Sequence, residues 1–343
     1  MFKTALFPAL TLGAALLGGV AQAAPAQPLA PKVMLIAMFG PEAQTWIDRL
    51  KLNQKVAVDG LSADYPDVLC NTAGVCLMTT GMGHANAAAS TLALTLSPRL
   101  DLRQTYILVA GIAGISPKEG TLGTTAWARY LVDFGIQWEL DSRDVPKDWP
   151  TGYLGINTRS PGEKPPLDYK TEVFELNVRL RDKAYALSRQ AQLTESVESK
   201  AWRQTYDYAP ANQPPVVTRC DTLAGDTWYS GTRLAERAEE WTRLVTDGQG
   251  RYCTTQQEDN ATYEALLRAS RLGKVDLQRL AVVRAGSDFD RPAKGASEVD
   301  NLLDYAKQGG FAPALENLYR TGNPLVQEIV EHWDVWQKGV PAS

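Results

Sequence analysis

Apolar residues along the chain form short runs that alternate with amphipathic segments. Residues 32–39 (KVMLIAMF) predict a buried strand, and a short turn leads from it into a helix over 42–50. Residues 75–96 repeat this order, with a strand, a glycine-rich turn and a helix of small residues. Residues 105–116 predict a third strand, and 121–136 predict one or two more. Strands that alternate with helices indicate an α/β domain with a largely parallel or mixed sheet.

The middle of the chain has a different composition. Residues 139–218 contain eight of the twenty prolines and several aromatic residues, with a polar helix predicted over 171–200. We interpret this segment as an insertion that covers one edge of the sheet or forms a cap. Beyond it the pattern predicts a return to the core at residues 220–231, an amphipathic helix over 233–245, and a strand that runs into a helix over 251–270. A late core strand is predicted over 277–290 and a C-terminal helix over 324–336.

The first residues have the pattern of a secretory signal peptide. Lys3 is the only charged residue before Lys32, residues 5–20 are apolar or small, and a small-x-small motif ends at Ala23. A retained membrane anchor is the alternative, although the run is short and contains a proline and three glycines. We therefore predict a signal peptide over residues 1–23, cleavage after Ala23, and a periplasmic or secreted protein.

Composition limits the domain organisation and the partners expected of the mature chain. Residues 24–32 are expected to form a disordered leader, and 33–343 one α/β domain that carries the insertion. No later stretch approaches the roughly 20 apolar residues of a spanning helix. The net charge of −4 becomes −5 without Lys3, which is unlike the basic surface of a nucleic-acid binder. We expect no nucleic-acid partner and no membrane span after cleavage, and leave a homo-oligomer open.

Four cysteines, an even number, favour disulfides in an exported protein. Cys70 and Cys76 bracket a turn-like segment between two strand-like runs, which predicts a disulfide across a hairpin. A bridge between Cys220 and Cys253 follows by elimination. A metal site is the alternative, but the spacing matches no zinc pattern and the chain has two histidines in all. We predict no metal.

Two glycine-containing loops follow strands, at residues 80–84 and 110–114. Glycine lets the backbone approach a ligand closely, and helix N-termini attract anions. Neither loop has the Walker spacing or the full dinucleotide fingerprint, and glycine at such a turn is often mere geometry. The candidate substrate-binding residues in these loops are Gly81, Gly83, His84, Gly111, Ala113 and Gly114.

Other candidates lie where strands end. Asp288 and Asp290 end the late strand, and ligands of α/β proteins collect at the carboxyl ends of strands. Glu258 opens a predicted helix, where an acidic residue is also favourable for the helix alone. Trp228 and Tyr229 follow a Gly-Asp pair and could equally be core aromatics. These residues define a candidate ligand site.

Several stretches together resemble one known family. They are TTGMGHANAA, LVAGIAGISPKEGTLGTTAWARY, CDTLAGDTWYSG, YCTTQQEDNAT and RAGSDFDRP. On these the chain resembles the purine nucleoside permease family of bacteria and fungi over nearly all its mature length. That family is in turn similar to the nucleoside phosphorylase and nucleosidase superfamily, in which residues 225–231 and 282–288 have close counterparts. The resemblance implies a three-layer α/β/α fold with a mixed, twisted sheet.

The resemblance also implies roles for individual residues. Asp288, with Ser287 beside it, takes the place of the acid that hydrogen-bonds the purine at N7. Glu258, with Gln257 beside it, takes the place of the glutamate that holds the ribose hydroxyls, and Trp228 that of the aromatic residue that stacks on the base. A purine leaves more readily once N7 is protonated, so Asp288 is the expected general acid.

The chain departs from the phosphorylases at their phosphate site. Their R-x-G-S-x-G motif binds phosphate through its arginine and serine, and the same positions here are Val109 and Ile112. An apolar pair cannot compensate a phosphate dianion. The loop near Gly40 also lacks a basic residue. These departures favour hydrolysis, with Glu42 as the candidate base for water and Phe39 as a further substrate contact.

We therefore predict a periplasmic purine nucleoside-binding enzyme that hydrolyses the nucleoside to base and ribose and needs no cofactor. Two alternatives stay open. One is a non-catalytic nucleoside-binding component of uptake, although a chain without spanning segments cannot itself form a channel. The other is a phosphate-dependent phosphorylase. The preferred purine and the choice between ribose and deoxyribose are not predicted.

Overall fold

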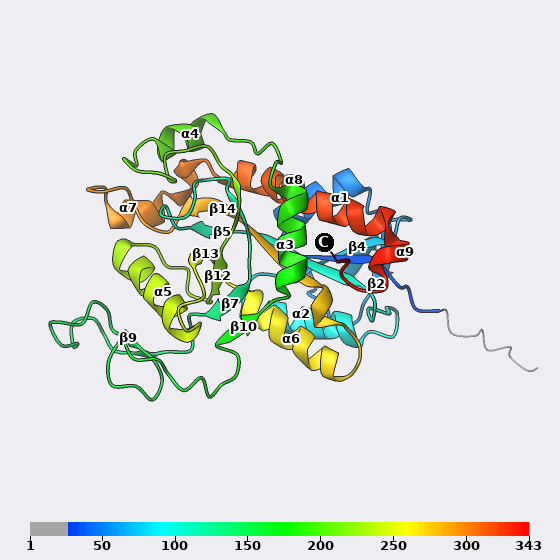
Figure 1. The fold of residues 1–343 in the computed structure, drawn as a ribbon, viewed down its shortest axis with the longest axis horizontal. Coiled ribbons are helices and arrows are strands. Elements are labelled where there is room, and N and C mark those ends of the chain that lie inside the picture. Colours follow the sequence, from blue (N-terminus) through cyan, green and yellow to red (C-terminus); the bar gives the residue numbers. More distant parts are fainter. Residues whose placement is uncertain (1–26, 343) are drawn as a thin grey trace, which may run out of the picture.

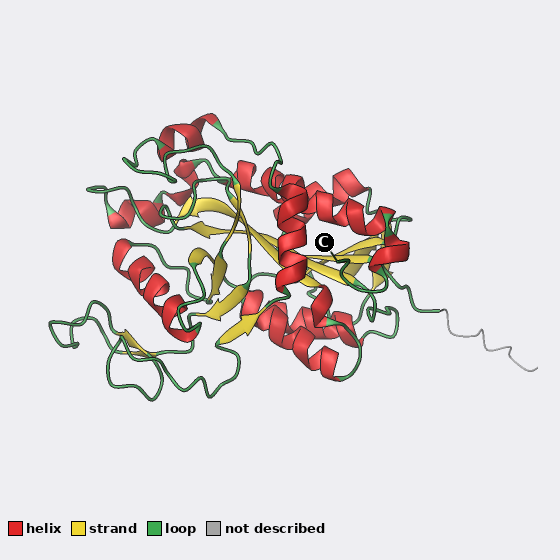
Figure 2. Cartoon of the chain, viewed as in Figure 1, coloured by secondary structure: helices red, strands yellow, loops and turns green. Residues whose placement is uncertain are grey.

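A twelve-stranded mixed sheet runs through the structure, a computed structural model that describes residues 27–342 (Figure 1). Helices cover both faces of this sheet (Figure 2). This arrangement confirms the predicted α/β class with a mixed sheet flanked by helices. The predicted signal peptide over 1–23 lies outside the described residues, as do residues 24–26 of the predicted leader. Residues 27–32, which were also predicted to be disordered, are attached to the domain, because the main chain of Leu29 bonds that of Arg99 and Asp101.

Four parallel strands form the centre of the sheet. In spatial order they are β4 (Val75–Thr79), β1 (Val33–Ala37), β5 (Tyr106–Ile115) and β14 (Leu280–Phe289). Every residue of β1, β4 and β14 is buried. Continuous apolar runs of this kind are typical of parallel strands that are covered on both faces, and they are why the sequence pattern located these strands.

The central strand β5 is long enough to have two neighbours along one of its edges. Ile36 of β1 pairs with Val109, in the first half of β5. Strand β13 (Tyr252–Gln256) pairs antiparallel with the last two residues of β5. β1 and β13 therefore approach each other end to end, and their carboxyl ends face each other across residues 110–113.

The remaining strands extend the sheet on both sides. Beyond β13 lie β12 (Asp221–Ala224), β7 (Tyr130–Asp133) and β10 (Val173–Glu175), and beyond β4 lie β3 (Asp67–Cys70) and β2 (Gln54–Ala57). β6 (Thr125–Trp127) pairs with β14 and with β11 (Val217–Arg219). β8 (Trp138–Glu139) and β9 (Tyr153–Leu154) form a separate two-stranded sheet.

Alternating side chains of the central strands attach helices to both faces of the sheet. Leu35 packs with helices α1 (Gly40–Leu50), α3 (Val178–Ser188) and α8 (Phe311–Glu331) on one face. Its neighbour Ile36 packs with α2 (His84–Leu96) and α6 (Asp259–Arg271) on the other. This period of two is the geometry of a strand. The other helical segments are α4 (Val197–Arg203), α5 (Thr232–Val245), α7 (Glu298–Leu303), α9 (Trp333–Trp336), η1 (Leu277–Arg279) and η2 (Tyr305–Gln308).

Two predicted helices differ from the structure. The single polar helix predicted over 171–200 is wrong, because this stretch contains β10, α3 and the start of α4. The side chains of Asn177 and Ser196 each cap the start of a new helix, which divides the stretch. The predicted C-terminal helix begins earlier than expected, since Pro324 lies inside α8 and not at its start.

Both predicted disulfides are present. Cys70–Cys76 joins β3 to β4 between two directly paired residues. Cys220–Cys253 joins the residue before β12 to β13. Within residues 27–342 no helix is long and apolar enough to cross a bilayer.

Candidate active site

The candidate residues gather where the carboxyl ends of β1 and β4 face those of β12 and β13. Glu42 follows β1, Gly83 follows β4, Asp226 follows β12 and Glu258 follows β13. Strand β5 spans this gap within the sheet, and β14, on the other edge of β5, carries Asp288 opposite Gly114. Crevices at the carboxyl ends of strands, where the strand order reverses, are the usual ligand sites of α/β sheets.

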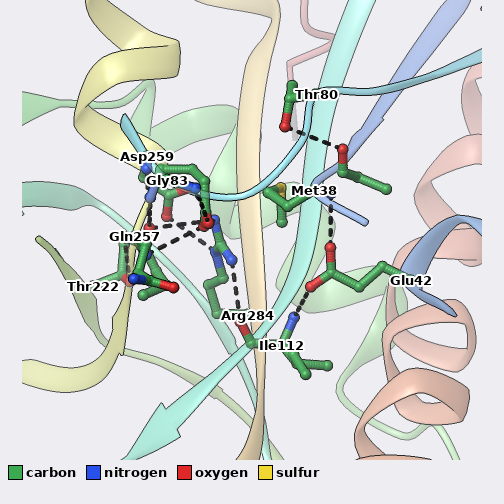
Figure 3. A network of polar contacts seen from close by, with 12 residues as sticks. Met38, Glu42, Thr80, Gly83, Ile112, Thr222, Gln257, Asp259 and Arg284 are labelled. Carbon is green, nitrogen blue, oxygen red and sulfur yellow. Dashed lines mark hydrogen bonds and ion pairs between the residues drawn. The ribbon is translucent and has the colours of Figure 1, made fainter. Parts of the chain in front are cut away.

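Arg284 of β14 is the cation at the centre of this group (Figure 3). It is 1% exposed, and its guanidinium donates to both carboxylate oxygens of Asp259 and, at 3.3 Å, to Oε2 of Glu258. A further bond of 3.1 Å goes to the carbonyl of Ile112. Burial alone would lower the pKa of Arg284, but these carboxylates outweigh it and raise the pKa. Arg284 is therefore a permanently charged, fully partnered centre.

Glu42, in the first turn of α1, lies beside Arg284. Its Oε2 accepts from the N–H of Met38 and its Oε1 from the N–H of Ile112, both at 2.7 Å. Burial raises the pKa of Glu42 to about 8, and Arg284 opposes this only in part. A Cβ at Gly111 would lie 2.5 Å from Nη1 of Arg284 and 3.0 Å from Oε1 of Glu42. Gly111 is thus needed so that these two groups can approach the strand.

Carboxylates also occupy the N-terminus of α2. Oε1 of Glu258 accepts from the N–H of Gly83 at 3.1 Å, and Oδ1 of Asp226 accepts from the N–H of His84 at 2.7 Å. Gly83 has φ 88°, in the left-handed region that favours glycine. Protein carboxylates therefore occupy this helix N-terminus, where the sequence alone would also allow a bound anion. Gln257 adds a 2.6 Å bond from its amide to the carbonyl of Asp226.

Asp288 lies further along β14, opposite Gly114. The pairing of β14 with β5 is irregular between Gly286 and Asp288, so Ser287 forms a bulge there. The Ser287 hydroxyl lies 2.7 Å from Oδ1 of Asp288 and 3.2 Å from the carbonyl of Ala113. Burial raises the pKa of Asp288 to about 6. A carboxyl with that pKa can carry a proton near neutral pH, as a general acid must.

Asp290, two residues later, has a structural environment. Its carboxylate accepts from the Tyr252 hydroxyl at 2.7 Å and is paired with Arg291. Tyr229 is buried and its hydroxyl lies 2.6 Å from that of Tyr252. The structure therefore places Tyr229 in the core beside Asp290, whereas Trp228 is 47% exposed.

The remaining candidates lie at the margin of the site. The Trp228 ring packs edge-on against Tyr305, with 4.7 Å between centroids. Phe39 lies 6.2 Å from the ring of Phe311. His84 is held between two acidic residues: its Nδ1 lies 3.3 Å from Oδ1 of Asp226, and its Nε2 lies 3.7 Å from Oδ2 of Asp133.

Arg284 and Asp259 are not among the site residues predicted from the sequence. An arginine in the middle of an otherwise apolar strand is a signal of a buried ion pair, because arginine is rarely fully buried without a partner. The sequence does not show which residue is its partner. Asp259 is the first residue of α6, and only the order of the strands in the sheet brings it close to Arg284.

Comparison with solved structures defines the class of fold. The chain is similar to a 5′-methylthioadenosine/S-adenosylhomocysteine nucleosidase from Neisseria meningitidis, with a TM-score of 0.51 over 85% of this chain and 98% of that one. It is also similar to the futalosine hydrolase of Helicobacter pylori, with a TM-score of 0.50 over 85% and 97%. Both are 12% identical to it, so the likeness concerns the fold, which is that of nucleosidases.

Sequence comparison is more specific. Residues 30–341 match the sequence model of the purine nucleoside permease family. A probable purine nucleoside permease of Schizosaccharomyces pombe is 39% identical over 318 residues, which cover 89% of this chain and 91% of that protein. A purine nucleoside permease of Candida albicans is 38% identical over 322 residues, covering 92% and 79%. The chain belongs to the purine nucleoside permease family, as its motifs predicted.

Proposed function

We propose that this protein is an exported, periplasmic or secreted nucleosidase that binds purine nucleosides and hydrolyses them to free base and ribose. The family membership and the nucleosidase fold support nucleoside binding. The two disulfides support export, because disulfides persist in oxidising compartments.

The charge around Arg284 is the observation that supports hydrolysis over phosphorolysis. This guanidinium already bonds Asp259 and Glu258, and Glu42 lies across Gly111 from it. A phosphate dianion placed here would meet carboxylates without a free cation, which is strongly unfavourable in a buried site. The position where phosphorylases carry arginine is Val109, in the apolar core. Water is the nucleophile that this environment admits.

The roles follow from position and protonation. Glu42 activates water, because a carboxylate whose pKa is raised to about 8 is a stronger base than an ordinary one. Asp288 donates the proton to N7 of the leaving purine. Glu42 and Arg284 lie beside Gly111, whereas Asp288 lies opposite Gly114, three residues further along β5. The base and the acid are therefore roughly 10 Å apart along this strand. We propose that a nucleoside binds between them with its glycosidic bond in the middle.

Glu258 and Trp228 complete the proposed complex. Glu258 is fixed by Arg284 and by the N–H groups of Gln257 and Gly83, which leaves one carboxylate lone pair, on Oε1, for a ribose hydroxyl. Such contacts can strengthen as the sugar becomes oxocarbenium-like. Trp228 offers an exposed ring on which the base can stack.

A nucleoside-binding component of uptake, without catalysis, is the second candidate, and it is favoured by the relatives, which are named purine nucleoside permeases. The Asp288→Asn variant separates the two. It keeps size and polarity but cannot deliver a proton. We expect release of hypoxanthine from inosine to fall by roughly 10²–10⁴-fold while calorimetry shows nearly unchanged inosine binding. A parent protein that binds inosine and releases no base would overturn the enzyme assignment.

A further inference from the structure

Among the described residues, no strand pairs with one edge of β14 at its carboxyl end. In the described chain β6 pairs with β14 only as far as Ala285. At Phe289, directly after Asp288, two side chains take the place of a strand: Oε1 of Gln308 accepts from the Phe289 N–H at 2.7 Å, and the Asn301 amide donates to the Phe289 carbonyl at 2.9 Å. Buried main-chain groups require such partners.

Asn301 and Gln308 belong to one segment, residues 298–310, which we name the strap. It contains α7 and η2 and returns across the end of β14 (Figure 1). Asn301 is 3% exposed and Gln308 is 0% exposed. The amide of Gln308 lies 3.3 Å from Oδ1 of Asn301, so each fixes the other. At the end of the strap Gly310 packs so closely on the Ser287 carbonyl that a Cβ would clash with it.

The same strap contacts the loop that carries Trp228. The Asn301 amide donates to the hydroxyl of Ser230 at 2.8 Å, besides its bond to Phe289. Tyr305, between α7 and Gln308 in the chain, packs on the Trp228 ring. One asparagine therefore joins the main chain beside the acid to the loop that presents the stacking ring.

We propose that Asn301 and Gln308 are positioning residues that set Asp288 at the correct distance from N7 of the bound purine. The inference rests on the proposed function, in which Asp288 protonates N7. The bulge at Ser287 interrupts the regular ladder just before Asp288, so the strap and not the sheet alone fixes the acid. Proton transfer requires a heavy-atom separation of about 2.6–3.2 Å, and a displacement of about 1 Å can reduce the rate by roughly 100-fold.

The test uses two substrates that differ in their need for an acid. Inosine requires protonation of its base, whereas 4-nitrophenyl β-D-ribofuranoside releases a weakly basic phenolate without a proton. In Asn301→Leu and in Gln308→Met we expect kcat for inosine to fall by roughly 10- to 100-fold. Hydrolysis of the 4-nitrophenyl riboside should stay within about twofold of the parent rate, because water activation at Glu42 is untouched. Two independent variants are used so that poor folding of one does not end the test.

Asn317→Leu is the matched control. Asn317 is also a fully buried asparagine that donates to main-chain carbonyls, those of Gly123 and Thr194, and it bonds neither Phe289 nor the Trp228 loop. A general loosening of the structure should lower both rates in parallel in this variant. If Asn301→Leu and Gln308→Met also lose both activities in parallel, or lose neither, the strap does not position the acid.

The parent protein and Asp288→Asn separate this inference from the proposed function. If the parent cleaves neither substrate, the proposed function fails. If Asp288→Asn does not lose inosine cleavage selectively, the assignment of the acid fails. When both behave as expected, the strap variants alone decide the inference.

Discussion

Replacing Glu42 by glutamine should make the protein relatively more stable as the pH rises, while it removes activity. The folded state holds the pKa of Glu42 at about 8 against an ordinary value of 4.5. A raised carboxyl pKa means that the folded state binds the proton more tightly than the unfolded chain. The stability that this provides is fully present below the ordinary value and is lost as the pH rises through the folded value.

The size of the effect follows from the pKa difference. Each pKa unit corresponds to about 1.4 kcal/mol, so between pH 5 and pH 8 the parent should lose about 3 kcal/mol of unfolding free energy through this one group. Glutamine cannot ionise and escapes this loss. It can accept only one of the two N–H bonds from Met38 and Ile112, which costs about 1–3 kcal/mol at every pH. The difference between the two pH values isolates the ionisation.

Urea unfolding of parent and Glu42→Gln at pH 5 and pH 8 measures this difference. The free energy of the variant relative to the parent should rise by about 3 kcal/mol from pH 5 to pH 8, with unchanged m-values. Glu175→Gln, at a half-exposed glutamate, is the control and should change by no more than about 0.5 kcal/mol. Turnover of Glu42→Gln should fall by roughly 100-fold or more, because no base remains.

A small pH dependence would show that the pKa of Glu42 is close to the ordinary value. If the relative free energy changes by less than about 1 kcal/mol between the two pH values, the burial of Glu42 does not raise its pKa as proposed. An ordinary ionised carboxylate that merely ties α1 to β5 would make glutamine equally destabilising at both pH values. That result would remove Glu42 as the base.

Three further outcomes are expected. The pH profile of kcat/KM should be bell-shaped with breaks near pH 6 and pH 8, because Asp288 must be protonated and Glu42 ionised. In Asp288→Asn the residual rate should rise to a plateau above pH 8. If this variant loses the break near pH 8 instead, the assignment of acid and base is reversed. Trp228→Ala should weaken inosine binding by about 1–3 kcal/mol in calorimetry, and an unchanged affinity would place the base elsewhere. Replacing Cys220 and Cys253 by serine should lower the unfolding free energy by roughly 2–4 kcal/mol in urea, whereas free thiols at these positions in the exported protein would contradict the bridge.

The core strands were predictable because local sequence alone determines them. β1, β4, β5 and β14 are short apolar runs bounded by turns, and such runs are typical of strands that are covered by helices on both faces. The segment 139–218 was not predictable in detail. Its strands β10 and β11 have three residues each, and they exist because β7 and β6 offer them a free edge. Pairing over such distances leaves no periodic signal in the sequence.

Part of the candidate site was likewise predictable from the sequence, and part was not. Asp288 and Glu258 could be selected individually, because each lies where a strand ends or a helix begins. Their relation could not, since β1 and β13 meet end to end only once β5 lies between β1 and β14. Asn301 and Gln308 are ordinary polar residues in the sequence, and only the missing strand beside Phe289 gives them a role.

Product analysis in the presence and absence of phosphate distinguishes hydrolysis of the nucleoside from phosphorolysis. The parent protein is incubated with inosine and with adenosine, first in phosphate-free buffer and then with added phosphate, and base and sugar products are identified by chromatography. We expect free base and free ribose at the same rate in both buffers, because Arg284 is already bonded to Asp259 and Glu258 and offers phosphate no unpaired cation. Formation of ribose 1-phosphate that depends on added phosphate would show that the protein is a phosphorylase and not a hydrolase.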